Sequence, residues 1–212
     1  MLREQWESLC GGPVALSAAA LDRIIDAYSV PTRRYHGTRH VIAVVSRVND
    51  LASQSLWTEQ HESPIDVGSA VLAAWYHDVV YDSTKAGNEE TSAQLAQREL
   101  AALNVDPAQV EHVAALVRMT AHHRPTDVAG ALLADADLWT LGGEPEEYFA
   151  YGKLIRAEYQ HVPESAWTTG RSTFIRSFLN RAHIFATPRG RHEREVQARR
   201  NLAAELAQLP SL

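Results

Sequence analysis

The stretch RHVIAVVSRVNDLA, residues 39–52, places apolar side chains three or four positions apart. This apolar stripe consists of Val41, Val44, Val45, Val48 and Leu51. The spacing follows the turn of an α-helix, so that one face can be buried while the other meets water. The stretch therefore predicts an amphipathic helix.

The rest of the chain repeats this pattern in segments of roughly 12 to 20 residues, separated by short runs with Pro, Gly, Asp or Ser. Ser17 and Asp106 are plausible N-caps, Pro107 suits a first turn, and the acidic residues after Asn88 suit a helix start. No stretch alternates apolar and polar residues for long enough to predict a strand. Helices are predicted within 17–28, 39–52, 63–80 (following Pro64), 88–103, 106–123, 127–141, 144–162, 172–185 and 194–209, with local breaks at 55–64 and 187–193.

Composition sets the class of protein. The chain has 212 residues, of which 45% are hydrophobic, and shows no repeat or long linker, so we expect one all-helical domain. A net charge of −6 argues against nucleic acid or an anionic membrane as partner. The single cysteine, Cys10, rules out an internal disulfide and suits a reducing compartment. Because neither a signal peptide nor an apolar run of about 18 residues occurs, we expect a cytoplasmic location and no membrane partner.

Two ionisable residues end an apolar run in AAWYHDVVYD, residues 73–82. Adjacent helical residues point about 100° apart, so His77 and Asp78 could both lean toward one point between helices. A divalent cation there would compensate the buried carboxylate and accept the imidazole lone pair. The alternative is a hydrogen-bonded core histidine followed by an aspartate that caps a helix end.

Other stretches supply further ligand types. His36 and His40 lie four apart, and thus on one helical face if the turn has begun by His36. Asp135 and Asp137 lie inside the apolar run LLADADLWTLG, residues 132–142. A set of two histidines and two aspartates would bind one divalent ion and leave positions open for water and substrate. Mn, Fe, Mg, Ni, Co and Zn all suit such nitrogen and oxygen ligands.

The ordered set resembles a known family. His40, the pair His77 and Asp78, and Asp137 are similar in order and separation to the H…HD…D signature of the HD superfamily of metal-dependent phosphohydrolases. The stretches RRYHGTRHV, AAWYHDVVYD, NEETSA, LLADADLWTLG and FIRSFLNRAHIF resemble a bacterial subgroup of predicted HD phosphohydrolases, from about residue 30 to the C-terminus.

The resemblance implies an all-helical HD-type bundle in which these four residues hold one metal ion. Asp137 is preferred to Asp135 because ADLW is similar to the ADxL form around the family's last aspartate. We expect a single domain over residues 1–212, with a metal-site region at about 30–145 and the C-terminal helices of 146–212 packed on it.

Four residues are candidates for catalysis. By similarity to the H-N-x-x-H motif of cyclic-nucleotide phosphodiesterases, His36 would be the proton donor, although Gly37 replaces the asparagine and a histidine bonded to the backbone is the alternative. Asp82 resembles an acidic residue near the attacking water in related nucleotide hydrolases, or is a helix cap or turn residue. His122 and His123 could protonate the leaving oxygen, contact a phosphate or bind a second metal, although we expect one ion.

The expected function is metal-dependent hydrolysis of a nucleotide or other small phosphate ester by a metal-activated water. Arg34, Lys153 and Arg156 are candidate phosphate contacts, although most surface charges only meet solvent. The expected partner is the small phosphorylated substrate, and we also consider a homodimer. Alternatives are a nucleotide or metabolite sensor without efficient chemistry, and an oxygenase with two irons on the same scaffold.

Overall fold

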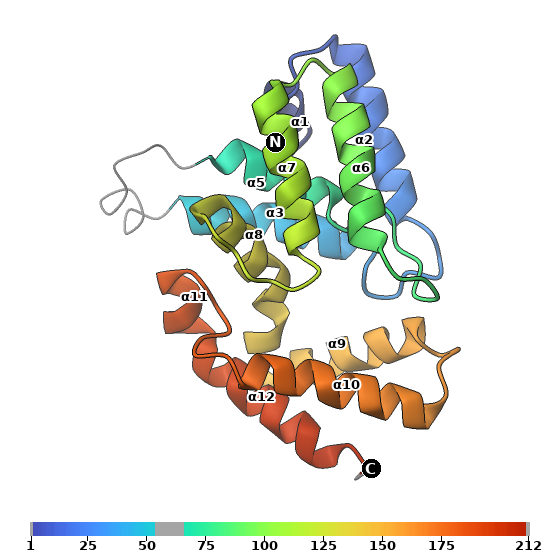
Figure 1. Cartoon of the computed structure of the whole chain (residues 1–212), viewed down its shortest axis with the longest axis vertical. Helices are drawn as coiled ribbons and strands as arrows, with labels where there is room; N and C mark the ends of the chain where they lie inside the picture. Colours follow the sequence, from blue (N-terminus) through green and yellow to red (C-terminus); the bar gives the residue numbers. More distant parts are fainter. Residues whose placement is uncertain (1, 54–65, 211–212) are drawn as a thin grey trace. The chain divides into compact units, whose positions relative to one another are not determined.

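The computed structural model describes residues 2–53 and 66–210, and these are built from helices with no strand among them (Figure 1). The all-α class predicted from the sequence is confirmed. The helices are α1 (Leu2–Leu9), α2 (Val14–Tyr28), α3 (Thr38–Ala52), α5 (Val67–Tyr76), α6 (Asn88–Ala102), α7 (Pro107–Met119), α8 (Val128–Leu138), the 3₁₀ helix η1 (Trp139–Gly142), α9 (Pro145–Glu158), α10 (Glu164–Leu179), α11 (Pro188–Glu193) and α12 (Glu195–Gln208).

The chain divides into two compact units, Met1–Ala136 and Asp137–Leu212. The first contains α1 to α7 and most of α8, and the second contains η1 and α9 to α12. The single domain, and the packing of the C-terminal helices on the metal-site region, stay predictions. No helix in the described part of the chain is both long and apolar enough to cross a bilayer.

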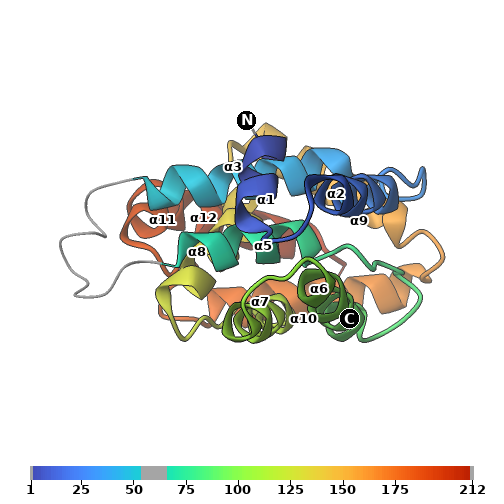
Figure 2. The same ribbon diagram turned by 90° about the horizontal axis from the view of Figure 1, so that it is seen from above.

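Helix α5 is the centre of the first unit. Every residue from Ser69 to Tyr76 is buried, as expected for a helix that is apolar on all sides. Figure 2 shows α5 between α3 on one side and the pair α6 and α7 on the other, and α5 contacts all three. The predicted stripe of α3, from Val41 to Leu51, is buried in this core.

Several predicted boundaries are wrong for identifiable reasons. Ser17 does not cap α2: the helix begins at Val14 after Pro13, and Ser17 is buried inside it. Helix α1 was missed; its Trp6 is fully buried, and the indole N–H donates to the Ser17 carbonyl at 2.8 Å. The predicted break at 187–193 contains α11, because the Thr187 side chain accepts the Gly190 N–H and starts a short helix.

Helix ends also differ from the prediction. Helix α10 begins at Glu164 rather than near 172, α7 ends at Met119 rather than 123, and α5 ends at Tyr76 rather than 80. The predicted break at 55–64 and the first residues of the predicted helix 63–80 lie outside the described residues. In contrast, Asp106 caps α7 as expected, with Pro107 in its first turn.

The second unit is held by polar contacts inside an apolar core. The Asn201 side chain of α12 donates to the carbonyls of Leu141 and Gly143 at 2.9 and 2.8 Å, which ties η1 to α12. The Arg171 guanidinium binds the Glu205 carboxylate with two hydrogen bonds, of 2.7 and 3.0 Å. Such a bidentate pair restricts the relative positions of α10 and α12.

In the first unit, His112 of α7 joins the starts of two other helices. Its Nδ1 lies 3.1 Å from the Asp66 carboxylate and its Nε2 lies 2.9 Å from the Asp127 carboxylate. Asp66 caps α5 through the Ser69 N–H, and Asp127 accepts the Gly130 N–H at the start of α8. Partial burial lowers the pKa of His112, but the hydrogen bonds with Asp127 and Asp66 outweigh it, and the pKa is raised overall. An imidazole can donate from both nitrogens only when protonated, so the bridge favours the charged form.

We expect Asp127→Asn to lower the free energy of unfolding at pH 6 by about 0.5 to 1 kcal/mol and to change it little at pH 9. A histidine with a raised folded pKa contributes stability that is complete below its unfolded pKa of about 6.5 and is lost as the pH rises through the folded pKa. The amide keeps the oxygen that accepts the Gly130 N–H, so the helix start is preserved. Urea unfolding across this pH range measures the difference, and an equal loss at both pH values would contradict the bridge.

Candidate metal centre

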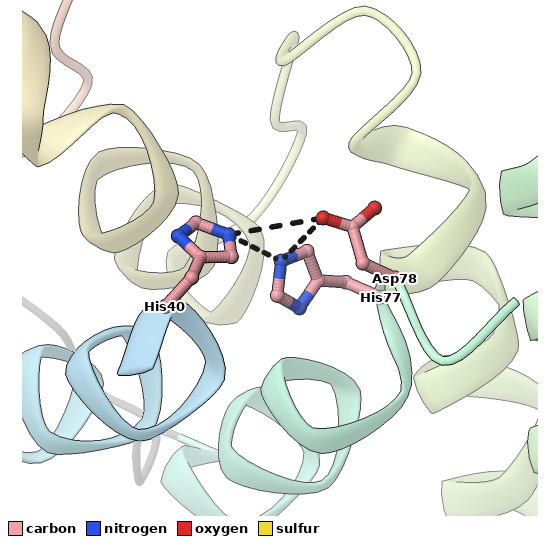
Figure 3. Close-up of side chains that lie close together, drawn as sticks. All are labelled: His40, His77 and Asp78. Atoms are coloured by element: carbon pink, nitrogen blue, oxygen red, sulfur yellow. Dashed lines mark hydrogen bonds and ion pairs between the residues drawn. The ribbon is translucent and has the colours of Figure 1, made fainter. Parts of the chain in front are cut away.

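Three of the predicted ligands converge in the first unit. His40 of α3, His77 at the end of α5 and Asp78 directly after it offer ligand atoms that all lie within 4.8 Å of one another (Figure 3). His40 Nε2 lies 3.1 Å from His77 Nε2, and Asp78 Oδ2 lies 3.3 Å from His77 Nε2 and 3.7 Å from His40 Nε2. We call these residues the HHD triad.

The ring of His77 is oriented by the backbone of its own helix. Its Nδ1 lies 2.8 Å from the Ala74 carbonyl oxygen, and a carbonyl can only accept, so Nδ1 carries the proton. In the neutral ring Nε2 then carries the lone pair, which faces the other two ligand atoms. A histidine ligand whose other nitrogen donates to a carbonyl is the usual arrangement in metal sites.

The separations in the HHD triad fit a small divalent ion. Neighbouring ligand atoms bound at about 2.1 Å lie about 3.0 Å apart in an octahedral site and about 3.4 Å apart in a tetrahedral one. The observed separations are 3.1, 3.3 and 3.7 Å. His40 and His77 are buried, and the Asp78 side chain is 15% exposed, so a cation would compensate a poorly solvated carboxylate. Nitrogen and oxygen ligands together suit the metals expected from the sequence.

Neither His77 nor Asp78 lies within α5, contrary to the prediction. Helix α5 ends at Tyr76, and His77 is its C-cap with helical dihedral angles (φ −56°, ψ −38°). His77 and Asp78 lie in a turn, in which the Val79 N–H donates to the Tyr76 carbonyl at 3.1 Å. The Tyr28 hydroxyl donates to the Trp75 carbonyl at 3.2 Å and accepts the Asp78 N–H at 3.1 Å. Side chains thus replace the helical partners that these backbone groups would otherwise have.

Two side chains of α6 bind the backbone of the segment that follows, residues 78–82. Ser92 of α6 bonds the N–H and the carbonyl of Val80 at 3.0 and 3.2 Å, and Asn88 does the same for Asp82 at 3.1 Å each. Buried backbone polar groups without partners are costly, so these contacts stabilise an irregular segment beside the core.

His36 lies beside the HHD triad. Its Nε2 is 4.0 Å from Asp78 Oδ2, and its ring stacks on Tyr81 with centroids 4.3 Å apart. Helix α3 begins only at Thr38, so the prediction that His36 and His40 share a helical face is wrong. The turn before α3, which contains Gly37, nevertheless brings both rings toward Asp78.

Asp82 has a structural explanation in this segment. Its carboxylate accepts the Thr84 N–H at 2.9 Å and the Thr84 hydroxyl at 2.6 Å, and pairs with Lys85 at 3.0 Å. These hydrogen bonds with Thr84 and Lys85 lower the pKa of Asp82 to about 2. Because α5 ends at Tyr76, Asp82 and Asp78 do not share a helical face. Its contacts are those of a turn residue, which was the alternative.

The remaining acidic and histidine candidates lie outside the HHD triad. Asp137 is the first residue of the second unit and stays a predicted ligand, while Asp135 is fully buried in α8. His122 and His123 lie in the turn after α7, where His122 Nδ1 accepts the Arg124 N–H at 3.1 Å and His123 has a φ of 48°. Their roles toward a phosphate or a leaving group stay predictions.

The predicted phosphate contacts differ in their surroundings. Arg34 and Lys153 are exposed. Arg156 donates to the carbonyls of Tyr159 and Val162 and to the Glu164 carboxylate, so it closes the turn between α9 and α10. These contacts assign Arg156 a structural role, and phosphate binding by any of the three arginine and lysine candidates stays a prediction.

Sequence reasoning missed the side chains that hold residues 78–82 in place. Asn88 and Ser92 were present in the stretch NEETSA and lie four apart on one face of α6, which is the signal that could have drawn attention to them. Tyr28 and Arg33 carried no comparable signal. Comparisons of the chain with protein-family models, with curated proteins and with solved structures found no match.

We expect Mn²⁺, Co²⁺ or Zn²⁺ to raise the melting temperature of the metal-free protein. An ion at a hundred times its dissociation constant adds about 2.7 kcal/mol, which corresponds to a shift of several degrees in a chain of this size. His77→Gln should lose the shift because it removes the oriented Nε2, whereas Asp26→Asn, an exposed aspartate of α2, should keep it. An equal shift in the wild type and His77→Gln would place the ion elsewhere.

Proposed function

We propose that this protein is a metal-dependent phosphohydrolase acting on a small phosphate ester, with nucleotides as the first substrate class to test. The observation that carries the proposal is the HHD triad, in which His77 Nε2 is aimed at His40 Nε2 and Asp78 Oδ2 by the hydrogen bond between His77 Nδ1 and Ala74. The order of these residues resembles the HD signature, and the proposal extends that resemblance to the reaction.

Within the proposal, His40, His77 and Asp78 bind one divalent ion, and Asp137 is the predicted fourth ligand. A bound ion of this kind lowers the pKa of a coordinated water and polarises a phosphoryl oxygen. Four protein ligands leave positions open for water and substrate on an ion with octahedral coordination. Arg34 is the predicted phosphate contact in the first unit, since a guanidinium can offer a phosphate two donors.

His36 holds the proton for the leaving oxygen. Its Nε2 faces the same Asp78 oxygen as the two histidine ligands but at the longer distance of 4.0 Å. The stacked Tyr81 ring keeps the imidazole plane of His36 in place. The position of His36 beside the proposed metal ligands supports its role as the proton donor.

Asp78→Ala is expected to abolish both metal content and phosphate release, because it removes the only carboxylate of the HHD triad. The measurement is elemental analysis together with a panel of nucleotides and simple phosphate esters in the presence of Mn²⁺, Co²⁺ or Mg²⁺. Turnover that survives with full metal occupancy would contradict the assignment. A wild type that is stabilised by a nucleotide but releases no phosphate would favour the sensor instead.

His36→Gln is expected to keep the metal and to lower kcat by about a hundredfold to ten-thousandfold for a substrate with an alkoxide leaving group. The loss should be much smaller for p-nitrophenyl phosphate, because a good leaving group needs little protonation. His112→Gln, which alters a histidine bound to Asp66 and Asp127, is the matched control. An equal loss for both kinds of substrate would show that His36 does not act as the proton donor.

Two histidines and one carboxylate with open positions also occur in oxygenases with one non-haem iron. Such an enzyme, rather than the oxygenase with two irons considered from the sequence, is the second candidate function. The HHD triad has this composition. Iron content combined with substrate-dependent oxygen consumption would support it. Phosphate release without oxygen consumption would support the phosphohydrolase.

A further inference from the structure

Arg33 bonds to both chain segments that supply the HHD triad. Its Nη1 donates to the Asp78 carbonyl at 2.6 Å and to the His36 carbonyl at 3.3 Å, and its Nη2 donates to the Val79 carbonyl at 2.9 Å. Asp78 and Val79 follow α5, whereas His36 precedes α3, which carries His40. One guanidinium therefore links the two segments directly at the carboxylate ligand.

Two tyrosine rings hold this guanidinium, and both also contact the site. The centre of the guanidinium lies 5.0 Å from the Tyr28 ring centroid and 5.6 Å from the Tyr81 ring centroid. The Tyr28 hydroxyl accepts the Asp78 N–H, and the Tyr81 ring stacks on His36. Cation–π contacts with two rings restrict the arginine rotamers, so the guanidinium N–H groups are already directed at the carbonyls before a metal ion binds.

The backbone of Arg33 packs closely against the turn that precedes α3. A side chain at Gly37 would meet the carbonyl oxygens of Arg33 and Tyr28 at 3.2 and 3.3 Å. The turn that carries Arg33 thus lies directly against the start of α3. We therefore expect a change in the Arg33 contacts to shift Asp78 relative to His40.

We propose that Arg33 is the positioning residue of the metal centre: by bonding to the carbonyls of His36, Asp78 and Val79, it sets the separation between the Asp78 carboxylate and the histidine ligands. This inference rests on the proposed function only in requiring that the HHD triad binds a metal ion. The planar fork of the guanidinium is needed because the carbonyls to be joined belong to different segments. Lysine, with a single nitrogen, cannot reproduce the two-nitrogen pattern.

The experiment compares Arg33→Met, Arg33→Lys and the control Arg39→Met, which removes an exposed arginine next to His40. Each metal-free variant is first melted, and binding is then measured at a temperature at which all of them are folded. Co²⁺ affinity is obtained by competition with a chelator, and the visible absorption of bound Co²⁺ reports the coordination geometry. Loss of a residue that orients metal ligands typically costs about tenfold to a hundredfold in affinity.

We expect Arg33→Met to weaken Co²⁺ binding by about tenfold to a hundredfold and to alter its absorption bands, with Arg33→Lys intermediate and Arg39→Met unchanged. If Arg33→Met does not fold, Arg33→Lys carries the test, and wild-type affinity with an unchanged spectrum in that variant overturns the inference. If Arg33→Met and Arg33→Lys both keep the wild-type Co²⁺ affinity and spectrum and only melt at lower temperatures, Arg33 has a purely structural role. An equal loss in Arg39→Met also overturns it, because any nearby cation would then suffice.

The result also separates this inference from the proposed function. If the wild type binds no Co²⁺, Mn²⁺ or Zn²⁺, the metal centre itself fails. If the wild type binds Co²⁺ and the Arg33 variants bind it equally, only the positioning role fails.

Discussion

The first unit depends on the way in which α5 ends. This helix is buried on all sides, so its last carbonyl groups cannot be satisfied by water and need partners from the protein. His77 donates to the Ala74 carbonyl and Tyr28 donates to the Trp75 carbonyl. The first of these hydrogen bonds also directs His77 Nε2 toward His40 and Asp78. The same contact therefore ends the helix and orients a predicted metal ligand.

The backbone groups of residues 78–82, which follow α5, also need partners from the protein. The segment runs beside the core outside any helix. The Val79 N–H donates to the Tyr76 carbonyl, and side chains from three places in the sequence bind other backbone groups of the segment: Tyr28, Arg33, and the pair Asn88 and Ser92. Such an arrangement restricts the position of Asp78. A carboxylate in this position is costly to desolvate, and the two imidazoles beside it are consistent with a site in which a cation supplies the compensating charge.

Much of the fold could be predicted from local patterns. The stripe of α3, the cap of α7 at Asp106 and the acidic start of α6 depend on residues within one or two turns of each other. Predictions failed where a distant contact decided the outcome. The buried Trp6 makes a short N-terminal helix part of the core, and Tyr28 helps to end α5 earlier than its apolar pattern indicates. Neither contact leaves a periodic signal in the local sequence.

The sequence by itself determined the helical class and the types of ligand available, because both depend on residue identity and spacing along the chain. It also singled out His40, His77 and Asp78, three residues that the folded chain brings within 4.8 Å. Only the tertiary structure decided which nitrogen of His77 faces the site, that Asp78 lies beyond the helix, and that Arg33 rather than its neighbour Arg34 bonds to the ligand segments. These features arise from hydrogen bonds between side chains and backbone groups far apart in the sequence, which exist only after the helices have packed.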